Sequence, residues 1–239
     1  MLADSEVHRA LVVTAHPDDV DFGAGATMAS WRQQGIEVTY CIVTDGDAGG
    51  FDPTVPRSQI PSIRRAEQTA PAAACGVTDV RFLGYRDGEL TVSHDLRRDI
   101  SRVIRQVRPQ RVVIQSPERN WERIYSSHPD HLAAGEAAIQ AVYPDARNPF
   151  AHPTLLQDEG LEDWAVPEVW VMAAKDPNHF VDVTDFFDAK IAALRAHESQ
   201  TGHMDDLVER IEGWLTTNAK AAGFNQGRLA EAFMVVSTA

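Results

Sequence analysis

The sequence predicts an α/β fold: a Rossmann-like, doubly wound, mainly parallel sheet with helices on both faces, in a single domain covering residues 1–239. Three observations favour this fold. Patterns typical of strands and of helices alternate along the chain, as they do in βαβ units. The first strand candidate is a short apolar run, which is typical of a strand buried inside a sheet. No internal repeat or linker divides the 239 residues, a length that one large α/β domain can fill.

The predicted strands are short runs rich in apolar, β-branched or aromatic residues. The first, ALVVT at 10–14, ends directly at His-Pro-Asp-Asp, and the second is EVTYCIVT at 37–44. The other strands are expected at 79–83, 111–115, 168–174 and 231–237.

The predicted helices end where glycine or proline follows them. The first, at 23–34, stops at Gly35, and a later one at 95–107 is closed by Pro109. A loop rich in Gly, Asp and Pro occupies 45–57. The other helices are expected at 58–75, which contains Pro71, at 129–142, which ends before Pro144, and at 185–198.

The composition is that of an ordinary globular protein, with 44% hydrophobic and 24% charged residues. No apolar run is long enough to cross a bilayer, and the N-terminus lacks the order of a signal peptide, so we expect a cytoplasmic protein. The net charge of −13 argues against nucleic acid or an anionic membrane as a partner. Cys41 and Cys75 lie in apolar segments without a CxxC pattern, so we expect reduced thiols.

Two clusters of His, Pro and Asp carry the chemistry. The first, AHPDD at 15–19, follows the first predicted strand. The second, HPDH at 128–131, follows the strand at 111–115 and opens an Ala-rich helix. In a doubly wound sheet, ligands bind in the crevice beyond the carboxyl ends of the strands. We therefore expect both clusters to reach the same edge of the sheet.

These residue types match a catalytic zinc site, which uses three His, Asp or Glu ligands and leaves one position open to water. The clusters supply such a set and leave Asp18, His128 and Asp130 for proton transfer. A single His-Asp pair at a helix start is more often a cap or a surface group. Two such clusters, both after predicted strands, are hard to attribute to capping and favour a metal site.

Other site patterns fit less well. Gly23 and Gly25 follow a strand as in a dinucleotide-binding loop, but Met28 stands where the third glycine is needed. The segment 45–47 (DGD) is similar to the start of a calcium loop, but Pro56 takes the place of the final glutamate. The sequence contains no GxSxG motif of a serine hydrolase.

The chain also resembles the LmbE-like, or PIG-L, family of N-acetylglucosaminyl deacetylases. The resemblance covers nearly the whole chain, and AHPDD with HPDH downstream is a specific signature. The matching segments, in order, are AHPDD at 15–19, TDGDAGG at 44–50, IRRAE at 63–67, VRFLGYRDGEL at 80–90, HPDH at 128–131 and VDVTDFFDAKIAALRAHESQ at 181–200.

The resemblance implies a zinc-dependent hydrolase whose metal ligands are His16, Asp19 and His131. It implies that Asp18 is the general base. It also implies that His128 stabilises the oxyanion or assists as an acid.

Further roles follow from the same resemblance. Asp130 would orient a neighbouring imidazole. Arg64 and Asp87 fall where relatives contact the sugar. His197 belongs to the family-like HESQ segment, and whether it or Asp21 contributes to the site stays open.

Three departures from the family pattern leave the substrate open. Many relatives carry Glu after AHPDD, whereas this chain has Val20. Relatives that act on thiol-linked glucosaminyl-inositol tend to have Tyr-Gly before HPDH and SGM after GYRD. This chain has Ser-Ser at 126–127 and Gly-Glu-Leu at 88–90.

The expected reaction removes an N-acetyl group from an N-acetylglucosamine-type sugar or conjugate, a small-molecule partner, with Zn²⁺ or another divalent cation. The first alternative is an amidase of the same family that cleaves a larger acyl group or a thiol conjugate. The second is a non-catalytic metal- or sugar-binding module. The oligomeric state is open, and a homo-oligomer is compatible with the sequence.

Overall fold

A seven-stranded sheet forms the centre of the computed structural model, which describes residues 1–238. Its strand order is β3-β2-β1-β4-β5-β7-β6. The first five of these strands pair in parallel, whereas β7 is antiparallel to both β5 and β6. The predicted mainly parallel, doubly wound sheet is therefore confirmed. The strands are β1 (Arg9–Thr14), β2 (Glu37–Thr44), β3 (Asp79–Tyr85), β4 (Arg111–Gln115), β5 (Glu168–Met172), β6 (His179–Asp182) and β7 (Ala230–Ser237).

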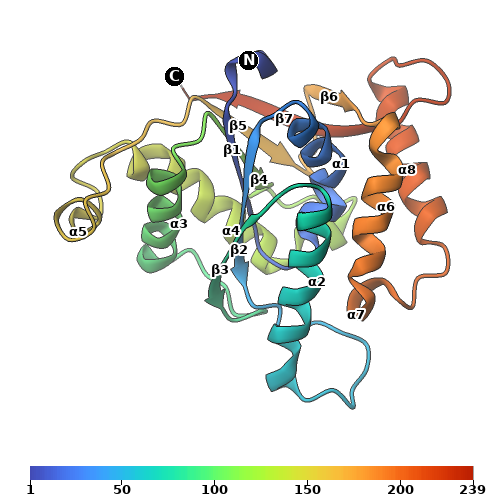
Figure 1. Cartoon of the computed structure of the whole chain (residues 1–239), viewed down its shortest axis with the longest axis horizontal. Helices are drawn as coiled ribbons and strands as arrows, with labels where there is room; N and C mark the ends of the chain where they lie inside the picture. The colour runs from blue at the N-terminus through green and yellow to red at the C-terminus, as the bar shows by residue number, and fades with distance from the viewer. Residues whose placement is uncertain (239) are drawn as a thin grey trace.

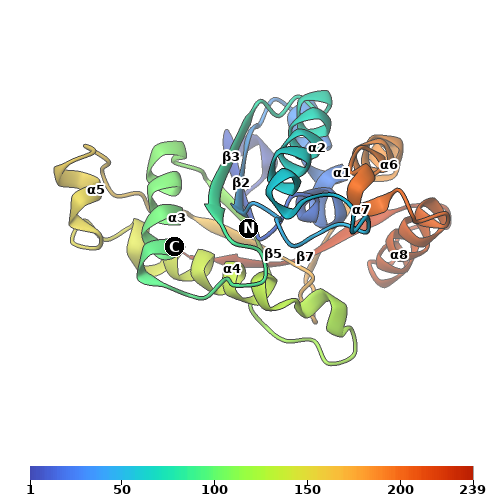
Figure 2. The ribbon, with the colours of Figure 1, turned by 90° about the horizontal axis from the view of Figure 1, so that it is seen from below.

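Helices cover both faces of the sheet (Figures 1 and 2). Helices α3 and α4 lie on one face, and α1 and α2 lie on the other. Helices α6 and α8 pack beside α1 on that second side, and α5 stands away from the body of the molecule. The helices are α1 (Asp19–Gln33), α2 (Ile60–Ala74), α3 (His94–Val107), α4 (Pro129–Gln140), α5 (Pro153–Gln157), α6 (Phe187–Ala196), α7 (Glu198–Thr201) and α8 (Leu207–Ala221).

Strand β1 shows why the sheet must be covered on both sides. Successive side chains of a strand point to opposite faces. Leu11 and Val13 belong to the core with α3 and α4, whereas Ala10 and Val12 belong to the core with α1. All four side chains are fully buried. A strand that is apolar on both faces is stable only between two layers of helices.

The observed elements differ from the predicted ones in three places. Helix α1 begins at Asp19, four residues before the predicted start at 23, because it follows the AHPDD loop without a spacer. The predicted helix at 185–198 ends at Ala196, and the short α7 begins after His197. Helix α8 and strand β6 were not predicted.

The connections of β1 and β4 create a crevice at the middle of the sheet. From β1 the chain proceeds to β2 and β3 on one side, and from β4 it proceeds to β5 on the other. Strands β1 and β4 are parallel neighbours. The order of the strands therefore reverses between them, and this is where open α/β sheets bind ligands. One His-Pro-Asp cluster follows β1, and the other follows β4.

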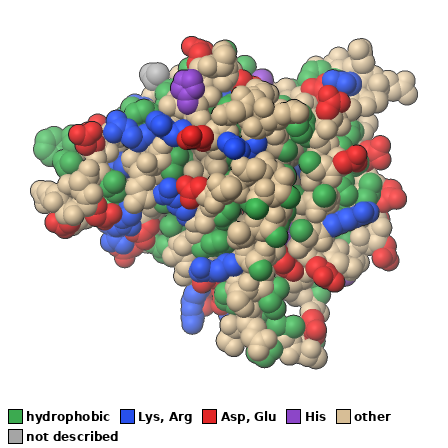
Figure 3. Space-filling model, viewed as in Figure 1, with side chains coloured by type: hydrophobic (Ala, Val, Ile, Leu, Met, Phe, Trp, Pro, Cys, Tyr) green, Lys and Arg blue, Asp and Glu red, His purple; other side chains and the backbone are tan. Residues whose placement is uncertain are grey.

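The surface mixes the two signs of charge. On the face seen in Figure 3, acidic and basic side chains are interspersed among neutral ones.

Within residues 1–238, none of the helices has the length and apolar character needed to span a bilayer.

Candidate active site

The loop after β1 is held by side chains from β4 and α2. The backbone N–H of Ala15 donates to Gln115 Oε1 (2.8 Å), which ties the loop to the neighbouring strand. Asp18 has φ = 103°, a backbone conformation that L-residues rarely adopt. Its N–H donates to Gln68 Oε1 (2.8 Å), and Arg64 donates to Asp18 Oδ2 (3.1 Å). These contacts hold the carboxylate of Asp18 in place despite the backbone strain.

The second cluster forms the start of α4. Pro129 occupies the first turn of the helix, where its missing N–H costs nothing. His128 is the N-cap, and its Nδ1 accepts a hydrogen bond from the N–H of Asp130 (3.2 Å). In a neutral ring the proton is then on Nε2. His131 lies three residues further along the chain and projects toward the loop of β1, where its Nε2 is 3.2 Å from His16 Nδ1.

The side chains of His16, Asp19 and His131 bring their ligand-type atoms together between the two loops, and we call these three side chains the donor triangle. His16 Nδ1 lies 3.2 Å from His131 Nε2 and 3.4 Å from an Asp19 carboxylate oxygen. The other Asp19 oxygen lies 3.1 Å from His131 Nε2. Tetrahedral bonds of 2.0–2.1 Å place neighbouring ligand atoms about 3.3 Å apart. Each of the three contacts therefore has the spacing of neighbouring ligand atoms on a tetrahedral metal ion, with one Asp19 oxygen beside each histidine.

His128 offers a further ring nitrogen close to this triangle. One ring nitrogen each of His16, His128 and His131 lie within 4.8 Å of one another. The side chain of His128 thus faces the same space as the triangle.

The second nitrogen of His16 contacts two carboxylates. His16 Nε2 is 3.0 Å from Asp87 Oδ1 and 3.2 Å from Asp130 Oδ2. Asp130 is itself fixed because it accepts hydrogen bonds from the N–H groups of Gly88 (2.7 Å) and Leu90 (3.2 Å). A carboxylate that binds one ring N–H leaves the lone pair of the other nitrogen free for a metal.

The cluster around His16 is rich in negative charge. Burial lowers the pKa of His16, but Asp130, Asp19 and Asp87 outweigh it and raise that pKa to about 12. The carboxylates thus hold a proton on His16 far more tightly than a free imidazole does. A divalent cation beside these groups would satisfy the same charge.

The pKa shifts of two further groups suit proton transfer. Burial raises the pKa of Asp18 to about 6, against the lowering effect of Arg64. Such a carboxylate is ionised at pH 7 but accepts a proton more readily than an ordinary one. Burial lowers the pKa of His128, and the charges of His16 and His131 lower it further. His128 is therefore neutral at pH 7 and keeps its Nε2–H as a donor.

Arg64 and Asp87, the two residues expected to contact the sugar, both contact the AHPDD loop after β1. The side chain of Arg64 is 3% exposed, and its guanidinium donates to the backbone oxygens of Pro17 and Gly46 as well as to Asp18. Asp87 faces His16 and lies 3.7 Å from Arg64. Their direct contact with the sugar stays a prediction.

A buried network behind Asp18 joins Asp21 and His197, whose part in the site the sequence left open, to Gln68, which was not predicted. Gln68 Nε2 donates to Asp21 Oδ2 (2.8 Å), and the same oxygen lies 2.8 Å from His197 Nε2. His197 therefore approaches the site through Asp21 and Gln68. Residue spacing on α2 could have indicated Gln68, because it lies four residues after Arg64 and therefore on the same face of the helix.

A large cleft opens from the donor triangle. Its volume is about 780 Å³, and Asp19 and His131 line it. Its apolar lining comes from α1, β5 and the α8 region, namely Phe22, Met172, Met204, Ile211 and Trp214. The cleft has the size and the mixed lining of small-molecule sites.

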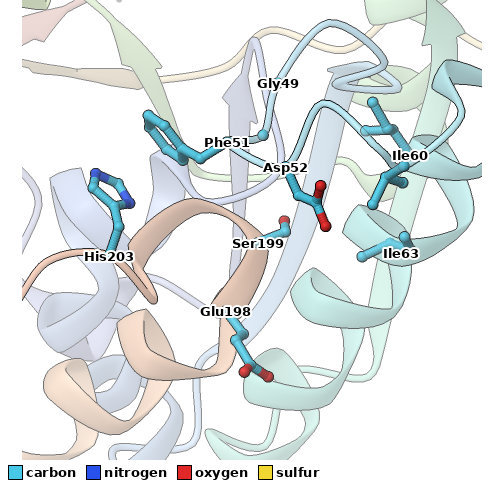
Figure 4. Close-up of a pocket in the computed structure, with 10 residues that line it drawn as sticks. Gly49, Phe51, Asp52, Ile60, Ile63, Glu198, Ser199 and His203 are labelled. Atoms are coloured by element: carbon cyan, nitrogen blue, oxygen red, sulfur yellow. The ribbon is translucent and has the colours of Figure 1, made fainter.

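A smaller cavity of about 320 Å³ lies between the 45–57 loop, α2 and α7 (Figure 4). The ring centroids of Phe51 and His203 lie 3.8 Å apart at its edge, and Ile60 and Ile63 line the α2 side. His203 is the one histidine that lines it, and no residue of the two His-Pro-Asp clusters does.

The fold and the site together define a class of protein: α/β proteins with a His/Asp metal-type site at the point where the strand order of a parallel sheet reverses. Residues 11–142, more than half of the chain, match the family model of PIG-L, described as GlcNAc-PI de-N-acetylase. The chain therefore belongs to the PIG-L family, and the family expected from its motifs is confirmed.

Individual relatives extend the match beyond residue 142. The chain is 34% identical over 233 residues to the diacetylchitobiose deacetylase of Thermococcus kodakarensis, covering 97% of this chain and 84% of that protein. It is 33% identical over 210 residues to a probable N-acetyl-alpha-D-glucosaminyl L-malate deacetylase 2 of Bacillus cereus, covering 84% and 88%. The structure of N,N'-diacetylchitobiose deacetylase from Pyrococcus horikoshii matches with a TM-score of 0.87 at 32% identity, covering 98% of this chain and 85% of that one. All three are deacetylases by name, which confirms the predicted class of enzyme, a hydrolase acting on amide bonds.

Proposed function

We propose that this protein is a zinc-dependent hydrolase that removes the N-acetyl group from an N-acetylglucosamine-type sugar or conjugate. The observation that carries the proposal is the close approach of the side chains of His16, Asp19 and His131, whose nitrogen and carboxylate oxygen atoms lie 3.1–3.4 Å apart in each pair. These three side chains would hold the metal. The names of the relatives support the substrate class.

When bound, zinc polarises the acetyl carbonyl and lowers the pKa of a water molecule in its open position to about 7. The protein's own residues do the rest. Asp18 takes a proton from the attacking water, whose oxygen forms the new bond to the carbonyl carbon. Arg64 keeps the carboxylate of Asp18 in position through its hydrogen bond (3.1 Å). Asp130 and Asp87 fix the ring of His16.

His128 donates its Nε2–H to the carbonyl oxygen as negative charge develops there. One such donor typically contributes 10²–10³-fold to kcat. Asp18 then returns its proton to the departing nitrogen, so the C–N bond breaks with release of an amine. The products are acetate and the free amino sugar.

Acetate release from purified protein tests the proposal. We expect turnover of diacetylchitobiose or of N-acetylglucosaminyl malate, loss of activity with a chelator, and recovery with Zn²⁺. Asp18→Asn should keep the metal and lose 10²–10⁴-fold in turnover, because the amide cannot accept the proton. Near-normal turnover by Asp18→Asn would reject Asp18 as the base, and Asp130 would be the next candidate.

A second candidate function is supported by the apolar wall of the cleft. Met172, Ile211 and Trp214 would accommodate a larger acyl group or a thiol conjugate. In that case the protein is an amidase with the same mechanism. Hydrolysis of long-chain or thiol-conjugated amides, without acetate release from any N-acetylated sugar, would establish it in place of the deacetylase.

A further inference from the structure

The charged residues of the large cleft are distributed unevenly. At the end that holds the donor triangle, the cleft is lined by Asp19, which faces His16 and His131. Away from it, the charged side chains that line the cleft are Arg123 and Arg210. Both are cations, although the chain carries a net charge of −13. The charged side chains on the wall away from the donor triangle are therefore all basic.

Arg123 is oriented by aromatic residues and has no acidic partner. Its Nε donates to Tyr125 Oη (2.9 Å). Its guanidinium carbon lies 5.5 Å from the ring centroid of Tyr125 and 5.6 Å from that of Trp214. Within residues 1–238, no carboxylate lies within 4.0 Å of its guanidinium. A stacked guanidinium is a preorganised fork for the two oxygens of a carboxylate or phosphate.

Arg210 supplies a second positive charge, and its present partner can be displaced by a ligand. It lies on α8, four residues before Trp214 and therefore on the same face of the helix. Its partner is Asp206, with N–O distances of 3.0 and 3.1 Å. Both side chains are about 60% exposed, at 59% and 62%. A pair this exposed contributes little, so a ligand oxyanion can compete for the guanidinium.

Apolar side chains fill the space between the basic wall and the donor triangle. Ile211 and Trp214 project from α8, Met204 lies just before that helix, and Phe22 and Met172 continue the lining toward Asp19. Contact with these side chains suits the carbon skeleton of a sugar and its substituent, and exclusion of water strengthens any charge pairing at Arg123.

We propose that the 116–127 segment and α8 form a subsite for an anionic group on the substrate, so that the preferred substrate is an acidic glycoside of N-acetylglucosamine. This inference rests on the proposed deacetylase function. Between the two substrate types named for the relatives above, a neutral disaccharide and a malate conjugate, it favours the acidic one. Arg123 is the specificity-determining residue, and Arg210 assists it.

A comparison of charged and neutral glycosides isolates the contribution of charge. The test measures kcat and KM for N-acetylglucosaminyl malate, its dimethyl ester, diacetylchitobiose and N-acetylglucosamine 1-phosphate. We expect the malate conjugate to exceed its ester at least tenfold in kcat/KM, with the difference mainly in KM. Comparison with the 1-phosphate tells whether the subsite prefers carboxylate or phosphate.

The variant Arg123→Gln tests the assignment to a residue. Loss of a charge-assisted hydrogen bond should lower kcat/KM for the malate conjugate about 10- to 100-fold, and leave the ester and diacetylchitobiose nearly unchanged. Arg119→Gln is the matched control, because Arg119 is an exposed arginine on the same segment, stacks on Trp121 and does not line the cleft. Equal turnover of acid and ester, with no effect of Arg123→Gln, would overturn the inference and leave the deacetylase function intact.

A binding measurement separates the two proposals. Calorimetric titration with glucosaminyl malate and with its dimethyl ester requires no turnover. If the wild-type protein deacetylates none of the sugars but binds the acid more tightly than the ester, and Arg123→Gln removes that preference, the anion subsite stands and the deacetylase function fails. Equal binding of acid and ester would overturn the subsite.

Discussion

Asp18 combines an unusual backbone conformation with an unusual pKa. The backbone conformation with φ = 103° costs about 1–3 kcal/mol. Two hydrogen bonds maintain it: the N–H of Asp18 donates to Gln68, and Arg64 donates to the carboxylate of Asp18. Burial raises the pKa of its carboxyl group to about 6. Both effects come from the same tight loop between β1 and α1, which keeps this carboxylate beside the guanidinium of Arg64.

The pKa of Asp18 predicts the acidic limb of the pH profile. Asp18 acts as a base only when ionised, so kcat/KM should fall as the pH drops through the pKa of its carboxyl group. A bound cation stabilises the ionised form, so we expect a midpoint at or below about pH 6. Measurement of kcat/KM from pH 4.5 to 8 checks this. A midpoint well above 6, or one that persists in Asp18→Asn, would assign the limb to another group.

Gln68 should act on turnover through Asp18. In Gln68→Ala, the N–H of Asp18 and the carboxylate of Asp21 each lose a partner. A lost hydrogen bond of this kind corresponds to about 1.4 kcal/mol, so we expect kcat to fall about tenfold with KM and metal content unchanged. Gln59→Ala, at an exposed glutamine just before α2, should have little effect. A change confined to thermal stability would show that Gln68 has no part in positioning Asp18.

The residues that sequence reasoning could identify are those with a chemical signature. His16, Asp19 and His131 stand in two rare clusters, each after a strand, and in the structure each of these side chains approaches the other two to within 3.4 Å. Gln68 and Arg123 have no such signature. An amide or a guanidinium acquires its function from what the fold places beside it, and that neighbour is 50 residues away for Gln68 and 91 residues away for Arg123.

At the scale of elements, α1 is joined to its neighbours by a buried ion pair. Lys190 of α6 is fully buried and donates to the backbone oxygens of Asp21 and Phe22, both at 2.7 Å. It also contacts Glu231 of β7 (2.7 Å), which accepts hydrogen bonds from two N–H groups of α1. The pair fixes the helix whose first residue is Asp19.

Breaking this pair should destabilise the whole protein. Lys190→Met leaves Glu231 buried without its counter-charge, which typically costs about 3–5 kcal/mol. For a chain of this length, 1 kcal/mol corresponds to roughly 2–4 °C in Tm, so we expect a decrease of about 10 °C. The double variant Lys190→Met/Glu231→Gln should recover part of the loss, because it removes the unpaired charge. Calorimetry that finds the single variant as stable as the wild type would contradict this account.

Sequence patterns predicted the elements of the sheet better than those of the cleft wall. The five parallel strands are short segments rich in apolar, β-branched or aromatic residues, and this pattern can be recognised without knowing which strands are neighbours. Helix α8 carries a clear stripe of Leu207, Ile211 and Leu215, yet it was not predicted, and α1 was predicted to begin too late. Polar residues dominate the first turn of α1, where Asp19 and Asp21 serve the site and weaken the amphipathic signal.

At the scale of the whole molecule, the site joins loops that are more than 100 residues apart. His16 and Asp19 follow β1, and His131 lies at the start of α4. A cation shared by these loops binds the folded chain and lacks a preformed site in the unfolded one. Metal binding should therefore stabilise the entire fold.

The stability of the protein should depend on the metal concentration. Free Zn²⁺ at 100 times its Kd adds about 2.7 kcal/mol, or roughly 5–10 °C in Tm. In His131→Ala we expect most of the bound metal and most of this increase to be lost. Elemental analysis and thermal scans with and without a chelator measure both. Unchanged metal content in His131→Ala would reject the ligand assignment.

Helix α8 and the reaction centre belong to different parts of the chain. The family model matches residues 11–142, which include the donor triangle and the 116–127 segment, whereas α8 lies beyond that match. Helix α8 packs against β6 and β7, at the antiparallel edge of the sheet. The α8 side of the cleft can consequently change without a change at the reaction centre. Exchange of α8 for that of another family member offers a direct route to re-targeting the same chemistry toward a different conjugate.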